Sequence, residues 1–184
     1  SIFIPPFDDY DIIAGQATVG LEIVEQMPEP LDYVFLAIGG GGLAAGTSLS
    51  LGALSPQTKI IGVEPEAAAS MTASLAVGHV EELSMIDKFV DGASVKRVGD
   101  KTFPICAKGL EDVVLISKSD VCQAMLDLYA LDAMIVEPAG ALSVAALHPY
   151  AEKIKGKTVV CIISGGNFDP KRFPEIKEAA AKTH

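Results

Sequence analysis

The sequence has few aromatic and few basic residues. Tryptophan is absent, aromatic residues make up 6% of the 184 residues, and 14 Lys and Arg residues oppose 24 Asp and Glu residues, giving a net charge of −10. Nucleic acids and anionic membrane surfaces are bound through concentrated Lys and Arg, so we expect neither as a partner. No apolar run reaches the roughly 18 residues of a membrane-spanning helix, and no secretory signal pattern is seen.

Cysteine is also scarce, and its spacing argues against two kinds of site. Cys106, Cys122 and Cys161 lie far apart and form no Cys-x-x-Cys pair. The sequence therefore predicts neither a disulfide framework nor a zinc site. Each cysteine lies in an apolar stretch, where a free thiol behaves as a small buried hydrophobic group. This usage is typical of a reducing compartment, and we expect a cytoplasmic protein.

Small aliphatic residues are abundant. Hydrophobic residues make up 49% of the sequence and glycines number 17, which supports a sizeable core with helices lying close to a sheet. Four runs rich in β-branched residues are predicted as buried strands: 33–38, 59–63, 112–116 and 158–163. Helices are predicted at 15–27, 43–54, 66–77, 100–108 (capped by Asp100), from Ser117 or Ser119 to 132, 139–147 and 175–182, with 78–99 irregular. This alternation predicts an α/β fold of three layers, with helices on both faces of a mostly parallel twisted sheet.

Four consecutive glycines, Gly39–Gly42, separate the first predicted strand from a helix. Such a run costs backbone entropy, and a loop whose N–H groups bind a phosphate at the helix N-terminus is the usual compensation. A tight turn without a ligand is the simpler interpretation, but four glycines at this position favour anion binding. A dinucleotide is a rival ligand, because Gly40-x-Gly42-x-x-Ala45 approximates the dinucleotide-binding motif and Glu64 ends the next strand.

A second glycine-containing turn, Ser164–Asn167, follows the last predicted strand. Ligands of parallel α/β sheets bind outside the carboxyl ends of the strands, so the Ser164 hydroxyl is expected to face the same crevice as the first turn. Taken alone, a serine at this position is better explained as a turn or helix-cap residue. A dinucleotide does not explain this second turn.

Several motifs, taken in order along the chain, resemble the threonine dehydratase (threonine deaminase) family of fold-type-II pyridoxal-phosphate enzymes, the tryptophan synthase β-like group. The serine racemases and serine dehydratases share this scaffold and remain close alternatives. The motifs are Pro5–Asp9, Ala14–Thr18, Gly39–Leu43, Gly62–Pro65, Phe89–Arg97, Glu137–Ala141 and Ser164–Asn167.

The resemblance implies a cofactor, pyridoxal 5′-phosphate, and a set of residues that bind it. Ser164 would hydrogen-bond the pyridine nitrogen, while Gly92 and Glu137 would lie near the ring and the substrate. A hydroxyl carries no charge to offset a protonated pyridine, so the ring is a weaker electron sink, which favours β-elimination over transamination. In the complete enzyme, the implied reaction converts L-threonine to 2-oxobutanoate and ammonia, in isoleucine biosynthesis. The phosphate would be bound by the backbone amides of Gly39, Gly40, Gly41, Gly42 and Leu43.

The family's Schiff-base lysine lies in a Ser-Phe-Lys type motif that this sequence does not contain. We therefore expect residues 1–184 to be the large cofactor-binding domain without the small domain that carries this lysine. No catalytic residue is expected in this chain, which would be inactive alone. The complete enzyme is expected to be a homo-oligomer acting on a small amino acid.

Other assignments have weaker support. Glu64 is a weak candidate metal ligand, and no metal is expected, because Ser70 stands where the racemase branch often has Asp. A nicotinamide-dependent dehydrogenase domain and a catalytically silent binding domain are the alternatives outside this family. No histidine neighbours a Ser or Cys in a triad motif, so a hydrolase has little support.

Overall fold

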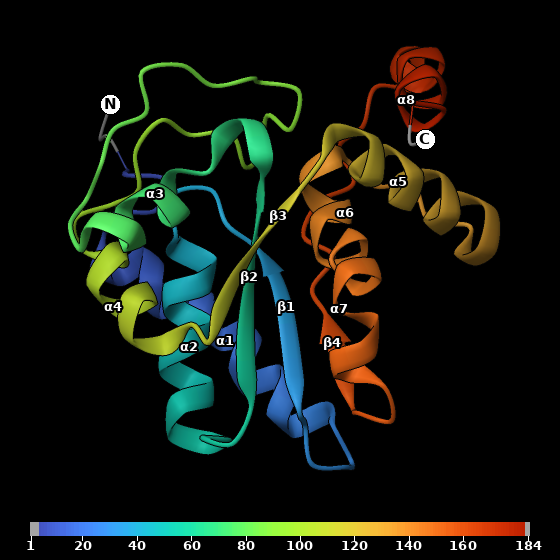
Figure 1. The fold of residues 1–184 in the computed structure, drawn as a ribbon. Helices are drawn as coiled ribbons and strands as arrows, with labels where there is room; N and C mark the ends of the chain where they lie inside the picture. The colour runs from blue at the N-terminus through green and yellow to red at the C-terminus, as the bar shows by residue number, and fades with distance from the viewer. Residues whose placement is uncertain (1–3, 183–184) are drawn as a thin grey trace.

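A four-stranded parallel sheet lies at the centre of the computed structural model, which describes residues 4–182 (Figure 1). The strands run in the order β3-β2-β1-β4, so each connection between sequential strands is a crossover that includes at least one helix. This arrangement confirms the predicted α/β class. The strands are β1 (Tyr33–Ala37), β2 (Lys59–Pro65), β3 (Asp112–Ile116) and β4 (Val159–Cys161).

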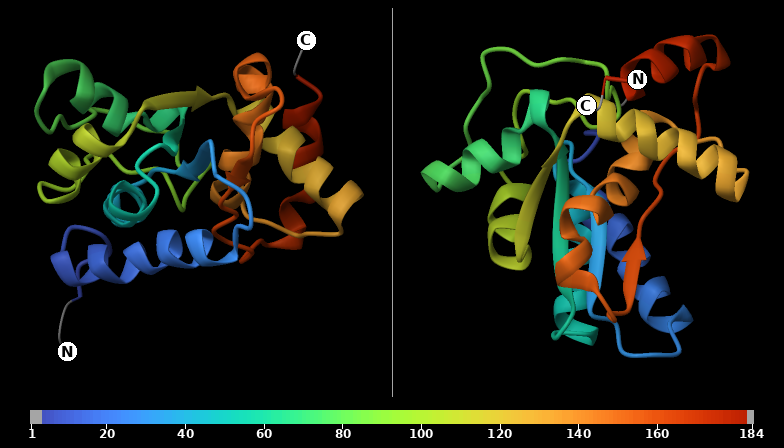
Figure 2. Two further views of the ribbon diagram at one scale, coloured as in Figure 1. Left: turned by 90° about the horizontal axis from the view of Figure 1, so that it is seen from below. Right: turned by 45° about the vertical axis from the view of Figure 1, so that its right-hand side comes forward.

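Helices cover both faces of the sheet and form two separate cores (Figure 2). Successive side chains of a strand point to opposite faces, and β1 shows this clearly. Val34 and Leu36 pack with the first four helices, whereas Phe35 packs with α5 to α8. The helices are α1 (Tyr10–Gln26), α2 (Gly42–Leu54), α3 (Ser70–Val77), α4 (Thr102–Gly109), α5 (Lys118–Asp132), α6 (Pro138–Ala145), α7 (Leu147–Ile154) and α8 (Phe173–Ala180), with 3₁₀ turns η1 (Glu66–Ala68) and η2 (Pro170–Arg172).

Helix starts account for two differences from the sequence prediction. α1 begins five residues earlier than predicted, because the Asp9 carboxylate accepts a hydrogen bond from the Asp11 N–H and caps the helix. α4 begins at Thr102, and Asp100 is not its cap as predicted. By contrast, the predicted Ser117 cap is confirmed, since its hydroxyl accepts from the Asp120 N–H at 3.1 Å.

The chain also contains a helix that the sequence prediction missed. The predicted helix 139–147 ends at Ala145, and α7 follows as a separate helix. Pro149 explains the break, because proline lacks an N–H and is tolerated in the first turn of a new helix. The predicted helix 66–77 likewise divides into η1 and α3.

The outer strands are less buried than predicted. β1 and β2 are buried along most of their length, but β3 and β4 have largely half-buried or exposed side chains. The physical reason is position, since β3 and β4 are the two edges of the sheet. The prediction of four fully buried strands is therefore wrong for these two.

The strand order creates a switch point between β1 and β4. After β1 the chain crosses to β2 on one side, while β4 returns on the other side of β1, with Phe35 opposite Cys161. Open parallel sheets bind ligands outside the carboxyl ends of strands at such a point. Both glycine-containing turns, after β1 and after β4, lie there.

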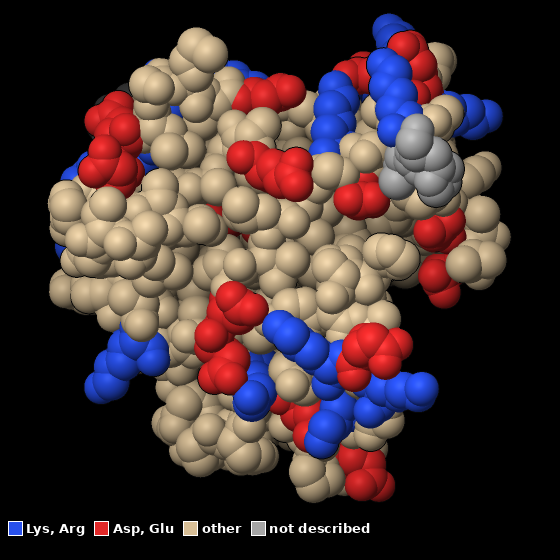
Figure 3. Space-filling view, in the orientation of Figure 1, with Lys and Arg blue, Asp and Glu red and all other residues tan. Residues whose placement is uncertain are grey.

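At the opposite end of the strands, the surface carries charges of both signs. On the face shown in Figure 3, Asp and Glu side chains lie among the Lys and Arg side chains. Half-exposed ion pairs of this kind contribute little to stability. The pairs are Lys59–Glu111 (2.8 Å), Lys157–Asp32 (3.3 Å) and Lys153–Asp112 (3.9 Å).

The three cysteines are free, as predicted. Cys106 and Cys122 are buried and Cys161 is half-buried. Burial raises the pKa of the thiols to about 12, 11 and 11 respectively, because a thiolate loses its hydration. Across residues 4–182, none of the helices is both long and apolar enough to cross a membrane.

Candidate functional site

A cavity of about 480 Å³ lies at the switch point between β1 and β4. Residues from both glycine-containing turns line it, together with segments from far along the chain. Its lining includes every residue predicted to bind the cofactor: Gly39, Gly40, Gly41, Gly42, Leu43, Gly92, Glu137 and Ser164. Pro6, Phe7, Gln16, Ala37, Ala93, Val95 and Ala139 complete it.

The Gly39–Gly42 loop ends β1 and presents the N-terminus of α2 to this cavity. Gly41 is the N-cap of α2, with φ of 93°, and no side chain caps the helix. Glycine is the residue that adopts this left-handed conformation without strain. Within residues 4–182, the N–H groups from Gly40 to Leu43 have no hydrogen-bond partner, so they remain available to a ligand.

The space around the loop requires glycine at Gly40 and is tight at Gly39. A Cβ atom on Gly40 would lie 2.2 Å from ring atoms of Phe7, and one on Gly39 would lie 3.3 Å from the Ala93 Cα atom. Bare backbone amides at a helix N-terminus bind a phosphate group. The loop therefore fits the phosphate of pyridoxal phosphate, and apolar lining residues such as Ala37 and Val95 fit the flank of an aromatic ring.

The second turn is held against the start of α6. The Glu137 N–H donates to the Gly165 carbonyl at 3.1 Å. A Cβ atom on Gly165 would lie 2.3 Å from Glu137 Oε1, and one on Gly140 would lie 2.5 Å from the Gly165 oxygen. The motifs Glu137–Ala141 and Ser164–Asn167 therefore pack as one unit, which requires glycine on both sides of the contact.

Ser164 is exposed to this cavity, and its hydroxyl has no hydrogen-bond partner among the described residues. The structure gives no helix-cap contact for it, so the helix-cap interpretation of this serine is not supported. A free hydroxyl in the lining can hydrogen-bond a ligand atom.

Gly92 approaches the site from the irregular segment between α3 and α4. A Cβ atom on it would lie 2.9 Å from the Ala139 Cβ atom and 3.1 Å from Glu137 Oε1. The same segment is anchored at Phe89, whose ring lies 3.8 Å from Lys118 Nζ and whose carbonyl accepts from Arg172. The sequence prediction of an irregular segment is confirmed, but its position is well defined by these contacts.

Glu64 lies outside this cavity and has a structural role. Its side chain is fully buried, and its oxygens accept from the N–H groups of Met71 (2.7 Å) and Thr72 (2.9 Å) and from the Thr72 hydroxyl (2.7 Å). Burial raises the pKa of this carboxyl, against the opposing effect of those hydrogen bonds. Glu64 thus caps α3 and is out of reach of a ribose, which removes the acidic residue that the dinucleotide alternative requires. No cluster of three or more metal-ligating side chains occurs in residues 4–182.

The sequence interpretation missed residues that complete the site. Phe7 and Gln16 lie in motifs that carried the resemblance, but no role was assigned to them. No sequence motif pointed to Thr102, because its contact with Gly40 joins residues that lie 62 positions apart. Among the described residues, no lysine lines the cavity.

Comparisons with known proteins indicate the family of this chain. The family described as "Pyridoxal-phosphate dependent enzyme" matches residues 1–165. The L-threonine dehydratase biosynthetic IlvA of Halalkalibacterium halodurans is 52% identical over 176 residues, which cover 96% of this chain and 42% of that protein. The protein of the same name from Bacillus subtilis is 49% identical over the same shares. The chain therefore spans less than half the length of these curated relatives.

Solved structures show the same fold. The processed form of threonine deaminase isoform 2 from Solanum lycopersicum has a TM-score of 0.92 and 41% identity, covering 96% of this chain and 52% of that one. Serine racemase from Dictyostelium discoideum has a TM-score of 0.83 and 35% identity, covering 90% and 53% respectively. These similarities confirm the fold class and the family resemblance expected from the motifs.

Proposed function

Because the chain belongs to the family of pyridoxal-phosphate dependent enzymes, we propose that it forms the cofactor-binding domain of a threonine dehydratase. The observation that carries the proposal is the single cavity lined by all eight residues that the family motifs singled out. The relatives named as biosynthetic threonine dehydratases support the substrate, L-threonine, and the products, 2-oxobutanoate and ammonia. We further propose that the protein is cytoplasmic and homo-oligomeric and acts in isoleucine biosynthesis.

Bound pyridoxal phosphate supplies an aromatic ring that takes up negative charge developing on the substrate carbon. The residues of this chain bind and orient that ring. The free amides from Gly40 to Leu43 would bind the phosphate with help from the α2 dipole. Glu137, held between Gly92 and Gly165, orients the substrate side of the cavity.

Ser164 sets how strongly the ring withdraws electrons. Its hydroxyl would hydrogen-bond the pyridine nitrogen but would bring no negative charge, so it would not hold that nitrogen protonated. A cofactor held in this way would favour loss of the β-hydroxyl over transamination. Ser164 is therefore a residue that directs the reaction outcome.

Among the described residues no lysine lines the cavity, and we propose that the chain alone does not turn over threonine. Equilibrium dialysis should detect pyridoxal phosphate bound to the 184-residue chain but no nicotinamide dinucleotide. Borohydride treatment should leave no adduct at a single lysine in peptide maps. A unique lysine adduct with formation of 2-oxobutanoate would contradict the proposal of an inactive domain.

A chimera tests the activity. In this chimera, the present chain would replace the matching segment of the Halalkalibacterium halodurans relative. The two segments are 52% identical over the 176 aligned residues. We expect L-threonine to be converted to 2-oxobutanoate faster than L-serine is converted to pyruvate, without racemisation of serine. A folded chimera that racemises serine preferentially would instead support the serine racemase alternative, to which the Dictyostelium structure is assigned by its name.

A further inference from the structure

Contacts to the backbone carbonyls of the Gly39–Gly42 loop set the direction in which its free N–H groups point. The Gly40 carbonyl accepts from the Thr102 hydroxyl at 2.6 Å and from the Gly99 N–H at 3.2 Å. The Gly41 carbonyl accepts from the Ala45 N–H at 2.8 Å and from Cys106 Sγ at 3.6 Å. The C=O and N–H of a planar trans peptide point in opposite directions. Holding these two carbonyls therefore turns the N–H groups of Gly41 and Gly42 away from α4.

Burial and hydrogen bonds hold the Thr102 side chain in its place beside the Gly40 carbonyl. Its side chain is fully buried, and its hydroxyl also accepts from the Gly99 N–H at 3.1 Å. The Gly99 carbonyl lies farther from the hydroxyl, at 3.3 Å, than the Gly40 carbonyl. The single hydroxyl hydrogen therefore goes to Gly40. Thr102 itself does not line the cavity.

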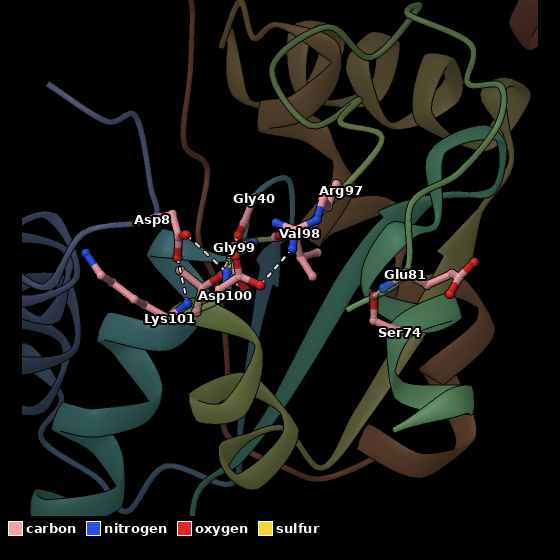
Figure 4. A network of polar contacts seen from close by, with 10 residues as sticks. Asp8, Gly40, Ser74, Glu81, Arg97, Val98, Gly99, Asp100 and Lys101 are labelled. Atoms are coloured by element: carbon pink, nitrogen blue, oxygen red, sulfur yellow. Dashed lines mark hydrogen bonds and ion pairs between the residues drawn. The ribbon is translucent and has the colours of Figure 1, made fainter. Parts of the chain in front are cut away.

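Asp8 holds the backbone segment just before Thr102. Figure 4 shows Asp8 reaching the backbone of Asp100 and Lys101, beside Gly40 and Gly99. Its carboxylate accepts from the Lys101 N–H at 2.7 Å and from the Asp100 N–H at 3.1 Å. Asp8 thereby holds the backbone that leads into α4, whose N-cap residue Lys101 makes no side-chain cap bond. The adjacent ring of Phe7 covers Gly40 from another side.

We propose that Thr102, supported by Asp8, is a positioning residue that aims the Gly41 and Gly42 amides at the cofactor phosphate. It touches neither cofactor nor substrate and acts through the Gly40 peptide. The inference rests on the proposed function, because the ligand is the phosphate of pyridoxal phosphate. It adds a residue from α4 to a site whose other parts come from the strand ends and the Gly92 segment.

The experiment compares two ligands that differ only in the phosphate. Dissociation constants of pyridoxal phosphate and of pyridoxal are measured by equilibrium dialysis for the wild-type chain, Thr102→Val and Thr102→Ser. We expect Thr102→Val to lose roughly 5- to 10-fold in affinity for pyridoxal phosphate while pyridoxal binding stays within twofold, as for loss of one hydrogen bond. Thr102→Ser, which keeps the hydroxyl, should restore the phosphate preference.

Thr47→Val is the matched control. Thr47 is also fully buried, but its hydroxyl has no partner, so the same substitution removes no contact with the loop. Equal losses for both ligands in Thr102→Val would overturn the inference, because a merely structural role lowers both. If Thr102→Val does not fold, Asp8→Asn provides the test. In this variant an NH₂ group, which donates, replaces one of the two carboxylate oxygens that accept from backbone N–H groups. An unchanged phosphate preference in that variant would also overturn the inference.

The ligand preference of the wild-type chain distinguishes failure of this inference from failure of the proposed function. A wild-type chain that binds both ligands equally would refute the phosphate site itself. A wild-type chain that prefers pyridoxal phosphate, with the same preference in Thr102→Val, would refute the positioning role alone.

Discussion

Replacement of Gly41 by alanine should destabilise the protein strongly, for two separable reasons. With φ of 93°, an alanine here adopts a left-handed conformation, which costs about 1–2 kcal/mol. Its Cβ would also lie 2.9 Å from Thr102 Oγ1, 3.0 Å from Thr102 Cβ and 3.2 Å from Met71 Cε. Thr102 is buried and hydrogen-bonded and cannot move aside without losing those bonds, so overpacking adds about 1–3 kcal/mol. The expected loss of unfolding free energy is about 2–5 kcal/mol, or a fall in Tm of roughly 4–20 °C.

Two other glycines separate these contributions. Gly78, with φ of 76°, has no atom within 4 Å of a built Cβ, so Gly78→Ala should cost only the conformational part, about 1–2 kcal/mol. Gly52 lies in α2 with similarly open space and no unusual φ, so Gly52→Ala should stabilise the helix by about 0.5–1 kcal/mol. Far-ultraviolet circular dichroism in urea measures all three unfolding free energies. If Gly41→Ala costs no more than Gly78→Ala, the contact with Thr102 is not rigid and the reasoning about the loop is refuted.

Other predictions concern buried titratable groups. The pKa of Glu64 is raised on folding, so the folded state binds more protons, and wild-type stability relative to Glu64→Gln should fall as pH rises above about 4.5. Urea unfolding from pH 4 to 8 measures this difference, and a difference that stays constant or grows with pH would contradict it. Folded protein should react slowly with a thiol reagent at pH 8, with Cys161 first because it is half-buried; rapid labelling of all thiols without denaturant would contradict their burial. Tyr150 donates to Asp112 at 2.5 Å, so Tyr150→Phe should cost about 1 kcal/mol in urea unfolding, and an unchanged stability would mean the bond contributes nothing.

Much of the fold was predictable because it rests on local sequence patterns. The strand 112–116 was predicted with its observed bounds, and β1 was predicted to within one residue. Buried parallel strands read as continuous apolar runs, which need no knowledge of their neighbours. The glycine run after β1 and the Ser117 cap were likewise visible in the sequence, because each acts within a few residues.

Two of the errors occurred where the position of distant segments decided the local structure. Asp100 looks like a helix cap, but its own N–H donates to Asp8, 92 positions away, and α4 begins at Thr102 without a side-chain cap. The apolar character of β3 and β4 suggested full burial, but their places at the sheet edges leave them partly exposed. No pattern within a short window contains either fact.

The sequence by itself determined the alternation of strands and helices, the two glycine-containing turns and, through the order of its motifs, the family. The tertiary structure decided that these turns border one cavity, that Glu64 caps a helix out of reach of any ligand there, and that Thr102 holds the Gly40 peptide from behind. Strand periodicity and turn chemistry act between neighbours in the chain, so a sequence displays them directly. The direction of an amide or the burial of a carboxylate depends on packing between segments tens of residues apart, and only the folded chain brings those segments together.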